Sequence, residues 1–585
     1  MIRLKEREVV IVGGGLTAGL VARRLVPLGR DVLVLERGPD RAGGPEEELP
    51  SQRDDLRWNT HRGLTQRENV ETITLRHKPD EQALPMRRLT SFLPGYGVGG
   101  AISHWNGQTW RFQTTDYVLR SHLLQRYGRG ALPADMTVQD WGLGYEDLEP
   151  YYTLFEQLFA ISGEAGNIKG VKRPEGNPFE PYRSAPYSLP PLEPTEFGLM
   201  FRKAAASLGY HPFPMPAANA SRAHRNPDGM QIGACQYCGH CERFLCEAKA
   251  KSSAATLLFP LVAGKKNFEM RPNAEVLRLV YDKAAKRVTS VIYADALTGE
   301  EYEQPAGTVV LGAYVFTNTR LLLLSGIGRP YDPKTGQGVV GKSYCYQTTS
   351  GVQVFFEDKY LNPFMGAGAL GTTIDDFNND HFDHAGLGFH GGAFISANHT
   401  NGRPIDTRPL PPGTPRWGTK WKEANAKWYL RSGNINCHGT SYSHRNNYLD
   451  LDPDYRDAWG RPLVRMTFDF PENDLKMSAY VTAKAGDIAK AMGATIINAT
   501  PRRGPYDARP YQSTHNTGGT IMGADRETSV VSPHLQCWDA ANLFISGASV
   551  FPQNSGYNPT GPVGALGLRL GDSLARYLER QQFLS

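Results

Sequence analysis

The sequence has few cysteines, no long apolar run and almost no net charge, and each absence excludes a class of protein. Seven cysteines among 585 residues are too few for the disulfide frameworks of small secreted domains. No stretch reaches the roughly 18 consecutive apolar residues that a membrane-spanning helix needs. The net charge of +5, from 64 basic and 59 acidic residues, gives no electrostatic reason to expect nucleic acid.

The N-terminus also lacks the succession of a basic region, an apolar core and a small-residue cleavage site that marks an export signal. We therefore expect the protein either to stay in the cytoplasm or to be carried out, after folding, with a partner. The length of 585 residues, 40% of them hydrophobic, predicts a soluble protein with two or more structural units.

A nucleotide-binding motif opens the chain. The apolar, β-branched run 9–12 is typical of a buried parallel strand. Gly13 allows a tight turn, Gly15 lets the backbone approach a pyrophosphate, and Ala18 lets the following helix pack on the strand. A second strand ends in Glu36, which is suited to accept hydrogen bonds from a ribose diol. The motif predicts dinucleotide binding without distinguishing NAD(P) from FAD; the alternative is an ordinary βαβ unit with no ligand.

Four further stretches are long and specific enough to identify a relationship: residues 95–112, 140–152, 309–328 and the block that starts at His515. With them, the chain resembles the glucose–methanol–choline (GMC) oxidoreductases, a family of FAD enzymes. Within the family it is most similar to the branch of gluconate 2-dehydrogenase flavoprotein subunits and bacterial glucoside 3-dehydrogenases. It departs from the usual family pattern in the stretch around Tyr314.

The resemblance implies an α/β fold (α+β overall), with a Rossmann-like FAD-binding domain and a substrate domain built on an antiparallel sheet. The implied FAD-binding segments are 1–149, 230–330, which also carries a cysteine cluster, and 510–585, which carries the catalytic residues. The implied substrate-binding segments are 150–229 and 331–509.

The resemblance also assigns site residues. His515 and Asn558 match the family's catalytic pair, and a histidine suits a base that removes a hydroxyl proton because its pKa lies near neutrality. The competing interpretations are a loop histidine with a local hydrogen bond and an asparagine that only caps a helix. His390 and His438 are weaker candidates for lining a sugar pocket. Besides the motif residues above, the implied cofactor contacts are Gly99, Gly100, His104, Trp105, Val276, Gly547, Ala548, Asn558, Pro559 and Thr560.

Four of the cysteines, Cys235, Cys238, Cys241 and Cys246, follow the spacing C-x2-C-x2-C-x4-C. Structural zinc sites usually combine two separated CxxC pairs, whereas consecutive CxxC steps resemble iron–sulfur cluster motifs. Four ligands would suit a [4Fe–4S] cluster and three a [3Fe–4S] cluster. Structural zinc and free thiols remain alternatives.

Together these features predict an FAD-dependent dehydrogenase that oxidises a secondary hydroxyl of a sugar, glycoside or aldonate to a ketone. The resemblance implies that electrons leave through the iron–sulfur cluster to an external acceptor, such as cytochrome c or a quinone-linked protein. It further implies a small accessory subunit whose signal carries the complex to the bacterial periplasm. The alternatives are a sugar or alcohol oxidase that uses O2 and holds structural zinc at the cysteines, and a flavoprotein that is only an electron-transfer or assembly subunit.

Overall fold

The nucleotide-binding motif folds as its sequence predicts. The computed structural model describes residues 1–42, 64–65, 72–242, 244–398 and 409–584. Strand β2 (Arg7–Val12) runs into a turn at Gly13, helix α1 (Leu16–Leu25) follows, and β3 (Val32–Leu35) pairs with β2 in parallel. The apolar side chains of both strands are fully buried because the strands lie inside the sheet.

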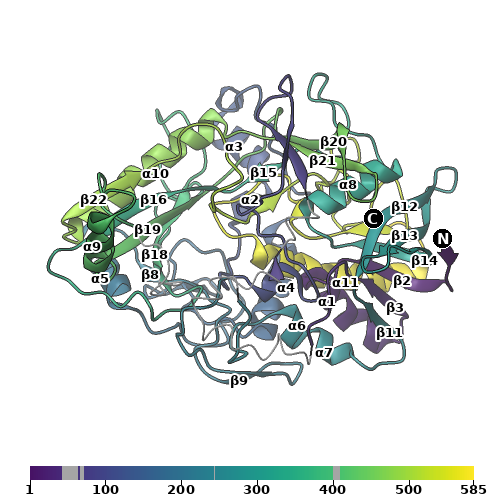
Figure 1. Ribbon diagram of the computed structural model, residues 1–585, viewed down its shortest axis with the longest axis horizontal. Coiled ribbons are helices and arrows are strands. Elements are labelled where there is room, and N and C mark those ends of the chain that lie inside the picture. The colour runs from purple at the N-terminus through teal and green to yellow at the C-terminus, as the bar shows by residue number, and fades with distance from the viewer. Residues whose placement is uncertain (43–63, 66–71, 243, 399–408, 585) are drawn as a thin grey trace.

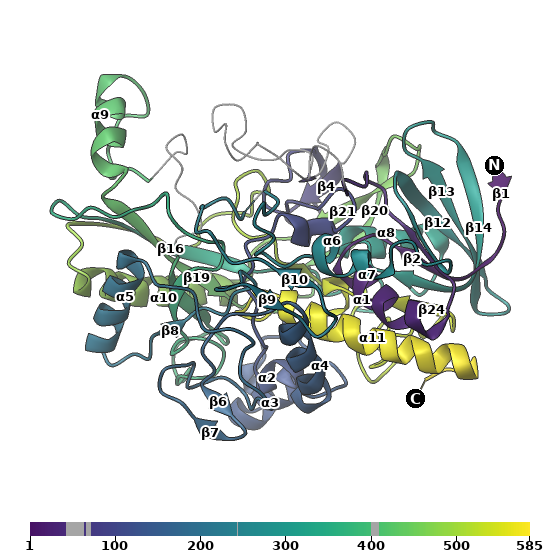
Figure 2. The same ribbon diagram turned by 90° about the horizontal axis from the view of Figure 1, so that it is seen from below.

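An eight-stranded sheet grows around this motif from segments that are far apart in the chain (Figure 1). Its order is β11-β3-β2-β14-β13-β12, with β1 and β24 also paired to β14. The added strands are β1 (Ile2–Arg3), β11 (Phe268–Arg271), β12 (Ala274–Asp282), β13 (Arg287–Asp295), β14 (Glu301–Leu311) and β24 (Leu543–Ile545). The C-terminal helix α11 (Thr560–Arg580) packs against α1 and α4 (Tyr145–Leu158), and Figure 2 shows it lying along this lobe.

A second sheet forms the opposite lobe (Figure 1), with antiparallel pairing throughout in the order β22-β16-β19-β18-β17-β8. Helices α10 (Glu472–Ala491) and α5 (Glu196–Ser207) pack on it through a separate apolar core. Its strands are β8 (Phe213–Pro214), β16 (Thr348–Phe355), β17 (Gly371–Ile374), β18 (Ala393–Asn398), β19 (Ser432–Gly439) and β22 (Ile496–Thr500). Helix α9 (Thr419–Trp428) projects from this lobe in Figure 2.

A third sheet joins early and late segments in the order β20-β21-β4-β5. Its strands are β4 (Ile73–Arg76), β5 (Leu84–Met86), β20 (Tyr448–Arg456) and β21 (Pro462–Thr467), and β21 pairs with β4 in parallel. Segments that we assigned to different domains therefore share a sheet, and the five-segment division stays a prediction. Within the described residues, no helix combines the length and apolarity required to span a bilayer.

Shorter elements complete the site. They are η4 (Gly100–Ser103), α8 (Val315–Ser325), β15 (Cys345–Tyr346), β23 (Asn516–Thr517) and η6 (Ala548–Val550).

Candidate active site

A cavity lies where the carboxyl ends of β2, β3 and β14 meet the start of α11. Nine of the predicted cofactor residues line it, although they come from five separate parts of the chain: Gly13, Gly15, Glu36, Gly100, Val276, Gly547, Ala548, Pro559 and Thr560. Neighbouring residues that the sequence interpretation did not name also line it, among them Thr17, Arg37, Tyr314, Asn318, Ser546 and Ser549. A cavity at the carboxyl ends of parallel strands is where α/β proteins bind nucleotides, so the arrangement suits FAD.

Two glycine turns, at Gly13 and Gly100, form part of the cavity wall, and each packs closely against another backbone segment. Gly13 has φ +96°, and a Cβ there would lie 2.8 Å from the carbonyl oxygen of Gly312. Gly100 has φ +61°, and its Cβ would lie 2.9 Å from the Cα of Gly15. Both positions therefore exclude a side chain on conformational and steric grounds. At Gly15 itself the nearest atom to a Cβ would be 3.9 Å away, which leaves space beside the N-terminus of α1 for a ligand.

Glu36, which the sequence predicts to bind a ribose, also has a structural role. Its carboxylate accepts backbone N–H groups of Gly14 and Gly38, each at 2.8 Å, and of Gly97 at 3.2 Å. The residue is buried, and it ties the first glycine turn to the segment that precedes Gly100. A carboxylate has about four lone-pair sites, so acceptance from a ribose hydroxyl stays a prediction alongside this structural role.

Five predicted cofactor residues lie outside the residues that line the cavity, and one of them, Asn558, is described below. Ala18 is fully buried in α1, and the N–H of Gly99 donates to Gly14 O at 2.8 Å. His104 is buried just after η4. Trp105 donates its indole N–H to Ser252 O at 3.0 Å. Gly99 and Trp105 thereby hold neighbouring backbone segments in place. Contact of any of these residues with a cofactor stays a prediction.

His515 lies immediately before β23, opposite the residue that leads into β16. Its Nδ1 lies 2.5 Å from Gln347 Oε1 and 2.9 Å from Ser513 Oγ. His438, on β19, reaches the same Gln347 oxygen through its own Nδ1 at 3.2 Å, and the two imidazole centroids are 6.3 Å apart. Burial, together with the neighbouring His438, lowers the pKa of His515 to about 3, and burial lowers the pKa of His438 to about 4. Both rings are therefore neutral at physiological pH, as a general base requires.

Asn558 is buried just before Pro559, the N-cap residue of α11. Within the described part of the chain, its Oδ1 has no hydrogen-bond partner. A buried carbonyl oxygen without a partner is costly, so this atom is free to accept a ligand hydroxyl or N–H. The position agrees with a helix-start residue that also contacts a ligand.

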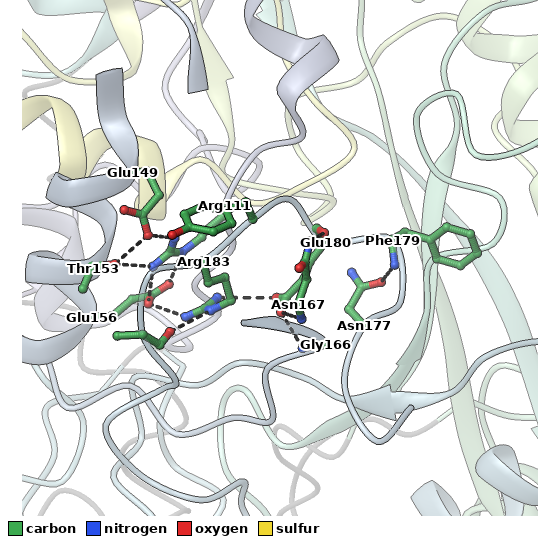
Figure 3. Close-up of polar contacts among 12 residues, drawn as sticks. Arg111, Glu149, Thr153, Glu156, Gly166, Asn167, Asn177, Phe179, Glu180 and Arg183 are labelled. Atoms are coloured by element: carbon green, nitrogen blue, oxygen red, sulfur yellow. Dashed lines mark hydrogen bonds and ion pairs between the residues drawn. The ribbon is translucent and has the colours of Figure 1, made fainter. Parts of the chain in front are cut away.

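A buried ionic cluster supports the chain behind Asn558. Tyr557 stacks on Trp110 with ring centroids 5.0 Å apart. Arg111, which follows Trp110 in the chain, donates to the Glu156 carboxylate through two nitrogens at 2.8 Å each. Arg183 donates to the same carboxylate at 2.5 Å. Figure 3 shows Glu156 between the two guanidinium groups, and the side chains of both arginines are essentially inaccessible to solvent. The cluster fixes the backbone that carries Trp110 and so supports Tyr557.

The four clustered cysteines line a second cavity of about 310 Å³, together with Asn219, Gln236, Glu247, Ala248 and Ala250. Three sulfur atoms receive N–H groups: Tyr237 N to Cys235 Sγ at 3.5 Å, Asn219 Nδ2 to Cys241 Sγ at 3.4 Å, and Lys251 N to Cys246 Sγ at 3.4 Å. Donors around sulfur suit thiolate ligands of a metal centre. Among the described residues, no group of three or more histidine, cysteine or carboxylate side chains is arranged to hold a metal ion.

Lys251 connects the cysteine cavity to the predicted cofactor segment. Its ammonium group donates to Cys241 O at 2.5 Å, Phe244 O at 2.8 Å and Trp105 O at 2.9 Å. The side chain is buried, and burial lowers its pKa. All three donors of the ammonium are used, so one side chain joins the cysteine loop to the residues that follow η4.

Sequence reasoning missed Gln347 and ranked His438 low. A glutamine before a strand carries no local signal of function, and its contact with His515 spans 168 residues. Tyr314, where the sequence departs from the family pattern, also lines the cofactor cavity, and its φ is +80°. Its hydroxyl oxygen accepts a hydrogen bond at 2.7 Å from Nδ2 of Asn516, the residue after His515. A non-glycine residue at positive φ is uncommon, so this departure from the family pattern has a defined place in the site.

Comparisons with known proteins identify the family of the chain. Two sequence profiles, each described as GMC oxidoreductase, match residues 199–347 and 443–567. The gluconate 2-dehydrogenase flavoprotein of Pantoea cypripedii is 43% identical over 96% of this chain and 92% of its own length. The fructose dehydrogenase large subunit of Gluconobacter japonicus is 28% identical over 98% of each chain.

Among solved structures, a variant of Aspergillus oryzae formate oxidase superposes with a TM-score of 0.59 at 16% identity, covering 99% of this chain and 100% of its own. This likeness confirms the predicted fold class. The profiles and the close relative confirm the predicted family, and the flavoprotein relative supports FAD as cofactor. The chain therefore belongs to the GMC oxidoreductase family and is an FAD-dependent oxidoreductase that acts on CH–OH groups.

Proposed function

We propose that this protein is a dehydrogenase that oxidises a secondary hydroxyl of a sugar, glycoside or aldonate to a ketone. Two observations support the proposal. The buried His515 contacts Gln347, whose amide nitrogen donates to the carbonyl oxygen of Gly556. Two residues further on, Asn558 Oδ1 has no hydrogen-bond partner within the described part of the chain. His515 removes the hydroxyl proton through Nε2, and Asn558 orients the substrate oxygen. FAD, held by the residues of the glycine-lined cavity, supplies the two-electron acceptor. The similarity to a gluconate 2-dehydrogenase flavoprotein supports a polyhydroxylated substrate.

The test is anaerobic mixing of the FAD-loaded protein with gluconate, methyl glucosides and fructose, each followed by flavin absorbance. Bleaching with one of these compounds, and a ketone in the product by NMR, would support the proposal. His515→Ala should retain FAD and lose the bleaching, by about 10²- to 10⁴-fold in rate. Unchanged bleaching in this variant would refute the role of His515.

The four cysteines complete the proposal as the ligands of an iron–sulfur cluster. The shared cavity and the N–H donors at three sulfurs support such a site, because hydrogen bonds to the sulfurs stabilise thiolate ligands. When bound, the cluster supplies one-electron steps to an external acceptor such as cytochrome c or a quinone-linked protein. A relative named as a large subunit supports an accessory subunit, and we propose that such a partner carries the complex to the periplasm.

An oxidase with structural zinc at the cysteines is the second candidate. Burial raises the pKa of Cys235 to about 11 and that of Cys241 to about 12, so the thiols stay protonated unless a metal displaces the protons. Metal analysis and a peroxide assay separate the two candidates. Iron with sulfide and no peroxide supports the dehydrogenase, whereas zinc with stoichiometric peroxide supports the oxidase.

A further inference from the structure

Gln347 lies between two imidazoles, and its orientation is set by a third contact. Its amide nitrogen donates to Gly556 O at 3.0 Å. The opposite end of the carboxamide, Oε1, therefore faces Nδ1 of both His515 and His438. A flipped amide would place its oxygen against the Gly556 carbonyl oxygen, a contact between two acceptors.

A carbonyl oxygen only accepts hydrogen bonds, so each facing Nδ1 must carry the proton. The contact from His515 is short, at 2.5 Å, and an unprotonated Nδ1 at this distance would bring two lone pairs together. Ser513 Oγ, 2.9 Å from the same Nδ1, also accepts the backbone N–H of His515 at 3.1 Å. It is therefore compatible with a protonated Nδ1.

The consequence concerns the other nitrogen of each ring. A neutral imidazole that carries its proton on Nδ1 has its lone pair on Nε2. In the part of the chain that the structure describes, neither Nε2 takes part in a hydrogen bond within the protein. His438 is held in place by stacking on Phe394, with centroids 4.9 Å apart.

We propose that Gln347 is a positioning residue that holds His515 and His438 together as Nδ1–H tautomers. The site then presents two Nε2 acceptors, one as the base for the reacting hydroxyl and one for a second hydroxyl. Two acceptors select a substrate with two neighbouring O–H donors, a vicinal diol, over a simple alcohol. This selectivity rests on the proposed function, whereas the tautomers themselves do not.

The first experiment measures the tautomers without catalysis. Long-range ¹H–¹⁵N spectra of the [¹⁵N]histidine-labelled protein distinguish Nδ1–H from Nε2–H rings, and the signals are assigned by their loss in His515→Ala and His438→Ala. Gln347→Leu should convert one or both rings to the Nε2–H form, because Ser513 can then donate to Nδ1 of His515. Rings that stay Nδ1–H in this variant would overturn the proposal.

The second experiment uses the pH profile of substrate-dependent flavin bleaching. Gln347→Leu should lower the rate by about 10- to 100-fold, the range seen when a histidine that binds a metal loses the hydrogen-bond partner that orients its ring. Gln347→Glu keeps an acceptor for each Nδ1 and adds a negative charge, but it loses the N–H that Gly556 O accepts. If His515 is the base, the acid limb should move up by about 1 to 3 pH units. An unmoved limb would show that residue 347 does not contact the base and would overturn the proposal.

The matched control is Gln353→Leu, which removes a glutamine within β16 that accepts Asn498 Nδ2 at 2.9 Å, six residues along the chain from Gln347. It should leave the tautomers and the profile unchanged, and retained FAD absorbance confirms that each variant is folded. Absence of bleaching by any polyol in the unmodified protein would refute the proposed function, whereas the spectra would still decide the role of Gln347.

Discussion

Burial of His515, the proposed base, should set the acid limit of activity. With a pKa of about 3, His515 is almost wholly neutral at pH 5.5, whereas a histidine at the ordinary value of about 6.5 would be only about 9% neutral. The rate of flavin bleaching at saturating substrate should therefore change less than about 2-fold between pH 7.5 and pH 5.5. An ordinary histidine base would lose about 10-fold over the same interval.

Anaerobic stopped-flow absorbance at the flavin band is the assay, because it reads the chemical step without an electron acceptor. Far-UV circular dichroism and the flavin spectrum at both pH values check that the protein stays folded and loaded. An acid limb with an apparent pKa near 6.5 would refute the reasoning, since it would place the base in contact with bulk water.

The same burial makes stability depend on pH. The pKa of both His515 and His438 is lowered on folding, so their stabilisation is complete above about pH 6.5 and is lost as the pH falls toward the folded values. At pH 5, which is about 1.5 units below the ordinary histidine pKa, each ring should lower the free energy of unfolding by about 2 kcal/mol relative to neutral pH. Urea unfolding at pH 7.5 and pH 5 measures this, and His438→Gln should lose less stability on acidification than the unmodified protein. Equal losses would contradict the assignment.

Three other perturbations test the surrounding structure. Glu156→Ala leaves the buried Arg111 and Arg183 without their shared carboxylate and should cost about 3–5 kcal/mol in urea unfolding; a loss below about 1 kcal/mol would show that water or neighbouring carboxylates replace it. Gly13→Ala should abolish FAD retention, because its Cβ would meet Gly312 O at 2.8 Å; retained flavin absorbance would contradict this. Cys238→Ser should lower the iron content if the cysteines bind a cluster, and unchanged iron by elemental analysis would count against Cys238 as a ligand.

The parts of this structure that the sequence predicts are the local ones. Strand β2, the turn at Gly13 and the start of α11 at Thr560 follow from apolar runs, a glycine and a proline within a few residues. These signals are local because strand burial and turn geometry depend on neighbouring residues. The family resemblance extended them to His515 and Asn558, whose shared catalytic role stays a prediction.

Other features depend on contacts between distant segments. Nothing near residue 347 indicates that its side chain meets two histidines, and nothing in β4 indicates a parallel partner in β21. Such pairings are set by packing of the whole chain, so local patterns do not encode them. Glu36 shows the same limit: its position was predictable, but its three backbone partners were not.

The order in which the chain is synthesised has a consequence for cofactor loading. The residues that line the cofactor cavity run from Val12 to Val563, and β24 completes its sheet only at Ile545. At about 5–20 residues per second, the ribosome needs roughly half a minute to two minutes to synthesise all the segments that line the cavity. FAD can be enclosed only after nearly the whole polypeptide has been made, so any passage across a membrane with the cofactor in place must move a finished, folded protein.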